Sequence, residues 1–283
     1  MDYKDVELGA TEDFFWFKAK IELIDILLRK VTLVRNSCSL TIEDEAFVPP
    51  SHKNDVSYQK EYAVFSNGVN TINKMKILDI GCGIGSELEV MKSYGDVYII
   101  DVEPKTIASI PDSICVEKKV CNVCDGIPYQ DSYFDIVVAF DLLEHLQDDV
   151  FVIGEIHRIL KKKGFLVFTV PAFQFLFSGH DWLLGHFRRY NKNLLKDRLR
   201  QFKCMEVGFW ACSLFLPVIF EKLLRYNKSN QTIKFRTFNK FFNNLFYNIL
   251  RFENYLIRYK VPLPFGTTIY GIYQNTKDIK NTS

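Results

Sequence analysis

Apolar residues recur with two different periods along the chain, and these periods predict its helices and strands. Residues 12–34 repeat apolar side chains every three or four positions, which predicts a helix. Further along, short apolar runs predict strands at residues 76–80, 97–100, 114–120, 134–140 and 164–170. Helical patterns lie between them at residues 87–94 and 148–162. Strands that alternate with helices favour βαβ units and a parallel sheet covered on both faces.

The pattern is less regular after Pro171. Residues 191–201 are predicted to be helical, and residues 204–210 and 267–273 are predicted to be strands. Between these two strands, apolar side chains recur at helical spacing at Phe238, Phe241, Leu245, Ile249, Phe252 and Leu256. A second, helical element therefore interrupts the end of the sheet.

Composition restricts the class of protein. Apolar residues make up 48% and charged residues 25% of the 283 positions, as in globular proteins. The 25 Phe and 14 Tyr exclude a disordered, collagen-like or coiled-coil chain. The formal net charge of +2 gives no reason to expect a nucleic-acid partner. The seven cysteines are irregularly spaced, the first residues are acidic and polar, and no apolar run could span a bilayer, so we expect a cytoplasmic protein.

Charge is unevenly distributed. Residues 222–260 contain nine Lys or Arg and one acid, Glu253. One interpretation is a helical lid whose Phe and Leu side chains close over a substrate pocket. The other is a peripheral helix at the inner membrane surface that presents a lipid-linked substrate. The two interpretations are compatible.

A glycine-rich turn follows the first predicted strand, in the sequence LDIGCGIG at residues 78–85. Gly81, Gly83 and Gly85 let the backbone turn sharply and let a ligand approach it closely. The first N–H groups of the following helix point toward the same turn and can donate hydrogen bonds to a ligand there. Asp101 ends the next strand, 20 residues after Gly81, where an acid can accept both ribose hydroxyls of a nucleoside.

The spacing of this turn distinguishes between cofactors. Dinucleotide enzymes use G-x-G-x-x-G, whereas this chain has G-x-G-x-G, with Ser86 where the third glycine would stand. Asp79 stands two residues before the first glycine, and its carboxylate would repel a pyrophosphate but attract an ammonium group. S-adenosylmethionine carries an ammonium and a sulfonium and no phosphate. The turn therefore favours this cofactor and disfavours a nicotinamide oxidoreductase.

At this point the sequence resembles the class I S-adenosylmethionine-dependent methyltransferases. Residues 121–135, CNVCDGIPYQDSYFD, are similar to the family's D-v-x-x-g-L-P-F-x-D-x-s-F-D, and residues 140–146 are similar to its segment ending in E-H-L. The resemblance implies a doubly wound, Rossmann-like α/β fold with a seven-stranded sheet, parallel except for one antiparallel strand. It also implies cofactor contacts at Asp79, Gly81, Cys82, Gly83, Gly85, Asp101, Val102, Asn122, Val123 and Phe140.

The same resemblance divides the chain into four parts. Residues 1–70 form an N-terminal helical cap, and residues 71–210 form the cofactor-binding core. Residues 211–262 form a helical insertion or lid, and residues 263–283 contain the last strand of the core and a tail.

Three further segments resemble a subset of the family that is often encoded near surface-glycan or lipid-linked sugar genes. Residues 14–20, FFWFKAK, look like W-W-f-x-x-R, with Lys20 in place of the arginine. Residues 181–190, DWLLGHFRRY, are similar to D-x-x-x-G-H-x-R-R-Y, and residues 263–267 look like L-P-x-G-t-S. The subset implies a sugar or lipid-linked glycan precursor as the methyl acceptor, with Trp16, Arg188, Arg189 and Tyr190 as its binding residues. Two arginines beside two histidines also suit an anionic or phosphorylated acceptor, whose charge Arg188 or Arg189 would bind.

Methyl transfer to an oxygen needs a base that takes the hydroxyl proton. The candidates are His145, His180, Asp181 and His186. In the structural alternatives, His145 packs the start of a helix, and Asp181 pairs with Arg189 to fasten a loop. We expect no metal, although Asp141, Glu144 and His145 could share one helical face and bind a divalent cation, as in some quinone-type methyltransferases.

The predicted function is therefore an S-adenosylmethionine-dependent methyltransferase, with S-adenosylhomocysteine as the second product, acting on a hydroxyl of a small molecule. One alternative is a methyltransferase-like partner subunit without catalysis. Another is a methyltransferase of a quinone or lipid-type substrate. An N/D-P-P-Y/F motif, expected of a nucleic-acid amino-methyltransferase, is replaced by AFDL at residues 139–142.

Overall fold

A computed structural model describes residues 14–37, 74–225 and 239–276. These residues contain one seven-stranded sheet with the strand order β3-β2-β1-β4-β5-β7-β6. The strands are β1 (Met75–Ile80), β2 (Gly95–Asp101), β3 (Glu117–Val120), β4 (Phe134–Phe140), β5 (Leu160–Pro171), β6 (Phe202–Trp210) and β7 (Thr268–Asn275).

All neighbouring strands from β3 to β5 pair in parallel, and β7 pairs antiparallel with both β5 and β6. The predicted doubly wound sheet with a single antiparallel strand is confirmed. The chain builds outward from β1 to β3 and then returns to place β4 on the other side of β1. Ligands bind in such sheets outside the carboxyl ends of the strands, at the point where the winding reverses.

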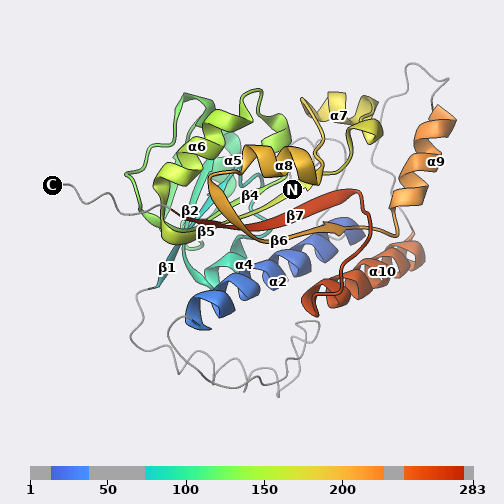
Figure 1. Ribbon diagram of the computed structural model, residues 1–283, viewed down its shortest axis with the longest axis horizontal. Coiled ribbons are helices and arrows are strands. Elements are labelled where there is room, and N and C mark those ends of the chain that lie inside the picture. Colours follow the sequence, from blue (N-terminus) through green and yellow to red (C-terminus); the bar gives the residue numbers. More distant parts are fainter. Residues whose placement is uncertain (1–13, 38–73, 226–238, 277–283) are drawn as a thin grey trace.

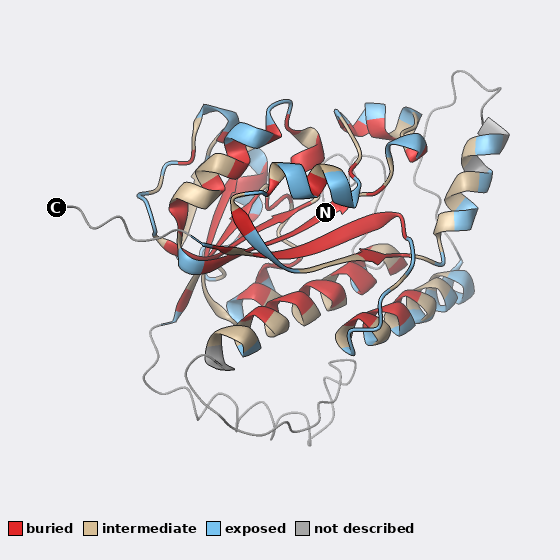
Figure 2. Cartoon of the chain, in the orientation of Figure 1, coloured by how far each residue is buried: buried red, intermediate tan, exposed pale blue. Residues whose placement is uncertain are grey.

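Helices cover both faces of the sheet (Figure 1). The helices are α2 (Phe15–Ser37), α4 (Leu88–Lys92), α5 (Pro104–Ser109), α6 (Asp149–Ile159), α7 (Gly179–Leu184), α8 (Lys192–Arg198), α9 (Phe215–Arg225) and α10 (Lys240–Arg258). Short 3-10 turns are η1 (Val123–Asp125), η2 (Leu143–His145) and η3 (Gln174–Leu176). One buried apolar cluster joins α2, α4, α5 and α10 to the sheet, and the other joins α6 and α8 to its opposite face. In Figure 2 the buried residues follow the strands and the inner sides of these helices.

The boundary between α6 and β5 differs from the prediction. The apolar pattern predicted a helix to residue 162, whereas α6 ends at Ile159 and β5 begins at Leu160. The lysines that follow therefore belong to the strand. Lys161 forms an ion pair of 2.8 Å with Asp135 of the neighbouring strand β4, which stabilises the extended backbone there.

The apolar face predicted for α10 points mainly to solvent. The helix packs against α2, with Leu250, Asn254 and Ile257 buried, and the Asn254 side chain donates a hydrogen bond of 2.8 Å to the Ala19 carbonyl. Phe241, Leu245 and Phe252 are exposed, and Phe238 lies outside the described residues. In the part of the chain that the structure describes, no helix is long and apolar enough to cross a membrane.

Candidate active site

The glycine-rich turn connects β1 to α4 at the carboxyl edge of the sheet. Gly81, Gly83 and Gly85 have φ angles of 73°, 51° and 76°, in the left-handed region that only glycine adopts without strain. A Cβ atom on Gly81 would also lie 2.8 Å from the Leu142 side chain. The backbone therefore requires glycine here, and Gly81 and Gly85 on either side of the buried Gly83 are half-buried.

Asp79 lies on β1 just before this turn, on the side of the strand that also carries Ile77 and faces α2 and α4. Its side chain is buried, and neither carboxylate oxygen has a hydrogen-bond partner among the described residues. Burial, with the nearby charge of Glu87, raises the pKa of this carboxyl well above its ordinary value. A buried, unpaired carboxylate beside a glycine turn is what a cationic ligand group would satisfy.

Asp101, at the end of β2, connects the turn to the neighbouring strand. One of its carboxylate oxygens accepts a hydrogen bond of 3.0 Å from the Gly83 N–H, and the other accepts one of 2.9 Å from the Glu103 N–H. Each carboxylate oxygen has two lone pairs, so both can also accept a ribose hydroxyl. The following residue, Val102, is exposed.

Asn122 and Val123 lie beyond β3, where the resemblance expects the adenine. The Asn122 amide oxygen caps η1 by accepting a hydrogen bond of 3.1 Å from the Cys124 N–H, and its amide nitrogen donates to Asp125. Val123 is buried in the core, as are Cys82 and Phe140. Asn122 is exposed and keeps one lone pair for a further donor.

Lys20 brings helix α2 into this site. Its ammonium lies 2.5 Å from the Asp141 carboxylate, whose other oxygen accepts a hydrogen bond of 2.7 Å from the Thr169 hydroxyl. Burial opposes the charge of Lys20, but Asp141, Glu87 and Glu144 attract it, and the pKa of Lys20 is raised overall. Lys20 therefore remains a cation among acids.

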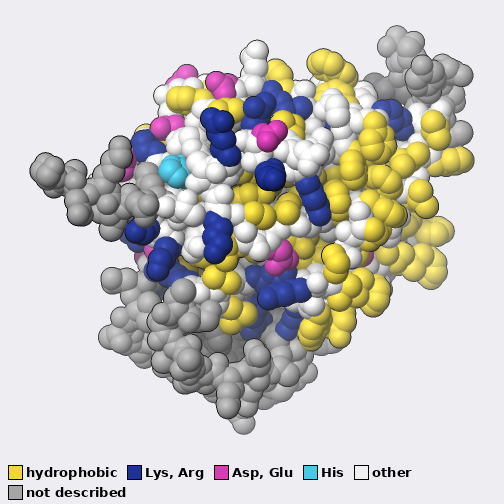
Figure 3. Space-filling model, viewed as in Figure 1, with side chains coloured by type: hydrophobic (Ala, Val, Ile, Leu, Met, Phe, Trp, Pro, Cys, Tyr) yellow, Lys and Arg dark blue, Asp and Glu magenta, His cyan; other side chains and the backbone are white. Residues whose placement is uncertain are grey.

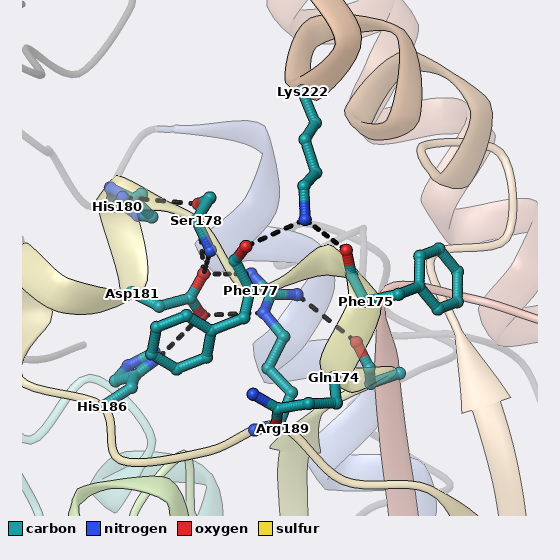
Figure 4. Close-up of polar contacts among 10 residues, drawn as sticks. Gln174, Phe175, Phe177, Ser178, His180, Asp181, His186, Arg189 and Lys222 are labelled. Carbon is teal, nitrogen blue, oxygen red and sulfur yellow. Dashed lines mark hydrogen bonds and ion pairs between the residues drawn. The ribbon is translucent and has the colours of Figure 1, made fainter. Parts of the chain in front are cut away.

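Asp181 organises the loop after β5 (Figure 4). Arg189 binds it through two nitrogens, at 2.7 and 3.0 Å, and Ser178 donates to it from its backbone N–H at 2.8 Å. The His186 Nδ1 atom lies 3.0 Å from the same carboxylate. Burial alone would raise the pKa of Asp181, but the hydrogen bonds from His186 and Arg189 lower it well below its ordinary value. The pairing of Asp181 with Arg189, expected as the structural alternative, is present.

His186 faces two further polar residues. Its ring lies 4.6 Å from the His145 ring, edge to face, and one ligand atom each of Glu144, His145 and His186 lie within 4.8 Å of one another. Glu144 is buried, and its Oε2 atom has no hydrogen-bond partner among the described residues. These three atoms could hold a proton or a divalent cation. Asp141 is not in this group, because Lys20 and Thr169 bind it elsewhere.

Several residues expected to bind the acceptor have structural partners instead. Tyr190 is fully buried, and its hydroxyl lies 2.8 Å from the Asp149 carboxylate and 2.9 Å from the Leu143 carbonyl. Arg188 also contacts Asp149, at 3.1 Å. With Arg189 bound to Asp181, these two arginines stabilise the loop with their charges already balanced. They therefore do not support an anionic acceptor.

Two further expected residues are half-buried. Trp16, on α2, is half-buried, with its ring 4.6 Å from that of Trp210. His180 is half-buried at the start of α7, where its backbone N–H donates to the Ser178 hydroxyl at 3.3 Å.

Sequence reasoning missed the contact between Lys20 and Asp141 and the approach of Glu144 to His186. A lysine within the apolar face of a helix was the available signal for the first. Glu144 and His186 are 42 positions apart, and neither motif spacing nor apolar periodicity indicates that two such distant residues meet.

The central residues of the chain match a known protein family. Residues 78–168, 91 of the 283, match the family model described as a methyltransferase domain. The match runs from β1 to β5 and includes the glycine turn, Asp101 and the E-H-L segment. The central part of the chain is therefore similar to a methyltransferase domain.

Individual relatives are more distant. An uncharacterised protein of Methanocaldococcus jannaschii is 28% identical over 54% of this chain and 68% of its own length. A probable S-adenosylmethionine-dependent methyltransferase of Mycobacterium tuberculosis is 24% identical over 62% of this chain and 65% of its own. A ubiquinone biosynthesis O-methyltransferase of Pseudomonas syringae is 28% identical over 50% of this chain and, again, 65% of its own. The chain thus spans about two thirds of these relatives.

Among solved structures, a SAM-dependent methyltransferase from Archaeoglobus fulgidus is 17% identical, with a TM-score of 0.46 over 76% of this chain and 93% of that one. The fold assignment of this chain rests on the strand order described above.

Replacing Asp79 with asparagine tests whether its carboxyl is protonated in the folded protein. Because its pKa is raised on folding, the folded state holds a proton that the unfolded chain has released. Stability then falls as pH rises toward the raised pKa, by at most about 1.4 kcal/mol per pH unit. The Asp79→Asn variant lacks this loss, so its advantage in the free energy of unfolding should grow as the pH rises above the ordinary carboxyl pKa of about 4 toward the raised pKa of Asp79.

Chemical denaturation at several pH values measures this advantage. Asp112→Asn is the matched control, because the Asp112 side chain is 89% exposed and pairs with Lys118 at the surface. If both variants show the same dependence on pH as the original chain, the Asp79 carboxyl is already ionised and the assignment is wrong.

Proposed function

We propose that this chain is an S-adenosylmethionine-dependent O-methyltransferase that acts on a hydroxyl of a sugar or lipid-linked glycan precursor. The buried, unpaired carboxylate of Asp79 at the glycine turn carries the proposal. An ammonium group is the ligand feature that such a carboxylate binds most strongly in a dry site. Bound S-adenosylmethionine supplies an activated methyl group, so the protein mainly has to align the acceptor and exclude water.

The charge around the turn supports this cofactor over a dinucleotide. Five acids lie at this edge and influence their neighbours electrostatically: Asp79, Glu87, Asp101, Asp141 and Glu144. Lys20 is a cation that attracts Asp79, Asp141 and Glu144. A pyrophosphate would add negative charge to a region that is already acidic. An ammonium and a sulfonium would reduce the repulsion. Asp101 and Asn122 lie where they could bind the ribose and the adenine amino group.

The loop after β5 supports an oxygen nucleophile. Asp181 holds the Nδ1 side of His186, which leaves Nε2 as the ring atom that can accept a proton from a hydroxyl. Arg189 keeps Asp181 ionised, so a positive charge on His186 would be stabilised after the proton moves. His145 and Glu144 border the same position. We infer that His186 is the base, that Asp181 orients it, and that His145 and His180 line the acceptor pocket beside Trp16.

Two acceptor classes fit these features. The likeness of residues 14–20, 181–190 and 263–267 to the glycan-associated subset favours a sugar or lipid-linked sugar. The similarity to a ubiquinone biosynthesis O-methyltransferase favours a quinone or lipid-type substrate as the alternative. Both acceptors present a hydroxyl, so the role of His186 is the same in each.

Calorimetric titration with S-adenosylmethionine, S-adenosylhomocysteine and NAD tests the cofactor. We expect the two sulfur ligands to bind with dissociation constants on the order of micromolar, and NAD to give no heat of binding. Binding of NAD alone would replace the proposal with an oxidoreductase. Absence of all binding would favour the partner-subunit alternative.

Replacing His186 with glutamine tests the base. The variant should bind S-adenosylmethionine as before, because His186 is not among the cofactor contacts, but its turnover should fall by about a hundredfold or more. Turnover is measured as labelled methyl transferred to lipid-linked sugars and, in parallel, to quinols. His157→Gln is the matched control, since His157 lies on α6 with its ring against Phe202.

Two results would contradict this assignment. Unchanged turnover of the His186→Gln variant would remove His186 from the reaction. Loss of turnover when a chelator is added to the original protein would assign Glu144, His145 and His186 to a divalent cation instead of a proton.

A further inference from the structure

Two helices of the insertion between β6 and β7 expose large apolar side chains on one side of the molecule. The most exposed are Leu216, Phe220 and Leu223 of α9, at 68%, 64% and 69%, and Phe241 of α10, at 71%. We call the whole set the apolar surface; it consists of Leu216, Phe220, Leu223, Phe241, Phe242, Leu245, Phe252 and Tyr255. Figure 3 shows hydrophobic side chains gathered on the side of the molecule where Figure 1 places α9 and α10. Contiguous exposed patches of this kind mark sites of association.

Helix α9 is held so that this face points outward. On its inner side, the Phe215 ring packs against Phe173, Phe175 and Phe265, at centroid distances of 4.8 to 6.3 Å. Lys222 donates hydrogen bonds to the Phe175 and Phe177 carbonyls (Figure 4). The contacts of Phe215 and Lys222 fix one side of α9 against the protein, and the opposite side is exposed to solvent.

Helix α10 carries apolar residues both on the side that packs against α2 and on the side that faces solvent. Leu250 and Ile257 are buried against α2, while Phe241, Phe242 and Phe252 face solvent. A helix that only covered the sheet would have a polar outer side. The outer side of α10 instead carries aromatic rings.

The charges along residues 222–260, which include all of α10, are almost all positive. Glu253 is the only acid in residues 222–260, and it is 5% exposed, because it accepts hydrogen bonds from the Cys212 and Ser213 N–H groups. The described bases on α10 and just after it are Lys240, Arg251, Arg258 and Lys260, all at least partly exposed. Aromatic and aliphatic side chains bordered by bases are the combination that binds the interface of an anionic lipid bilayer.

The apolar surface adjoins the loop of the candidate site. The carbonyls that Lys222 binds belong to Phe175 and Phe177, just before the segment that carries Asp181 and His186. Within that segment, Trp182 of α7 is 74% exposed. Exposed apolar side chains thus occur on α9, α10 and the loop beside the proposed base.

We propose that the apolar surface docks the protein onto an anionic lipid bilayer, so that a lipid-linked acceptor can reach the site from the membrane. The second half of this statement rests on the proposed function, whereas the docking itself does not. The occupant is the bilayer interface. The positive border and the absence of exposed acid on α10 distinguish it from the surface of a protein of mixed charge.

Co-sedimentation with vesicles tests the docking. The full chain is mixed with vesicles of phosphatidylcholine alone and with vesicles that also contain phosphatidylglycerol. We expect binding to the anionic vesicles that weakens as salt is raised, because the lysines and arginines contribute to it. The double variant Phe220→Ser with Phe241→Ser should bind at least about tenfold more weakly, since it removes two of the most exposed rings.

The matched control is Val150→Ser with Phe151→Ser, which removes exposed apolar side chains from α6, on the far side of the molecule from α9 (Figure 1). This control should bind vesicles like the original chain. Calorimetry with S-adenosylhomocysteine on all three proteins separates the two proposals, because vesicle binding without ligand binding would retain the docking and remove the proposed function.

Three outcomes would overturn the docking. The first is no binding of the original chain to anionic vesicles. The second is equal loss of binding in the double variant and in the control. The third is a dimer, seen by sedimentation velocity, that the double variant loses and that does not bind vesicles, because the apolar surface would then be an interface between two copies of this chain.

Discussion

Asp79 holds a carboxyl group inside the sheet, where neither water nor a described residue solvates it. Most of the site can be understood from this constraint. Burying an unpaired charge costs several kcal/mol, so the carboxyl group is either protonated or ionised beside a bound cation. The glycine turn lies next to it, and the neighbouring acids Glu87 and Asp101 make the region attractive to positive charge.

The protein balances the other charges around this position. Lys20 reaches from α2 to Asp141, which fixes the N-terminal helix over the carboxyl edge of the sheet. Asp141 therefore already has a cationic partner. Arg189 does the same for Asp181 in the loop after β5, and Arg188 and Arg198 do it for Asp149. Asp79 and Glu144 are left with unpaired buried oxygens, at the glycine turn and beside His186. A carboxylate without a partner in a network that pairs its neighbours indicates where a ligand belongs.

The sequence predicted the sheet well, because its strands are short apolar runs separated by helices of regular period. It also predicted the glycine turn and Asp101, since local backbone geometry fixes both. It did not predict which acids are paired, because Lys20 and Asp141 lie 121 positions apart and meet only in the folded chain. Tyr190 shows the same limit: its motif suggested an acceptor contact, but its hydroxyl reaches Asp149 in the core.

The central claim is that Asp79 recognises an ammonium group, and the protons released on ligand binding test it most directly. Calorimetry in two buffers of different ionisation enthalpy measures this release for S-adenosylhomocysteine and for methylthioadenosine, which lacks the amino-acid portion. We predict that S-adenosylhomocysteine releases protons near neutral pH, because its ammonium restores the ionised form of Asp79, and that methylthioadenosine releases none and binds at least about tenfold more weakly. Equal proton release and equal affinity for the two ligands would contradict the account.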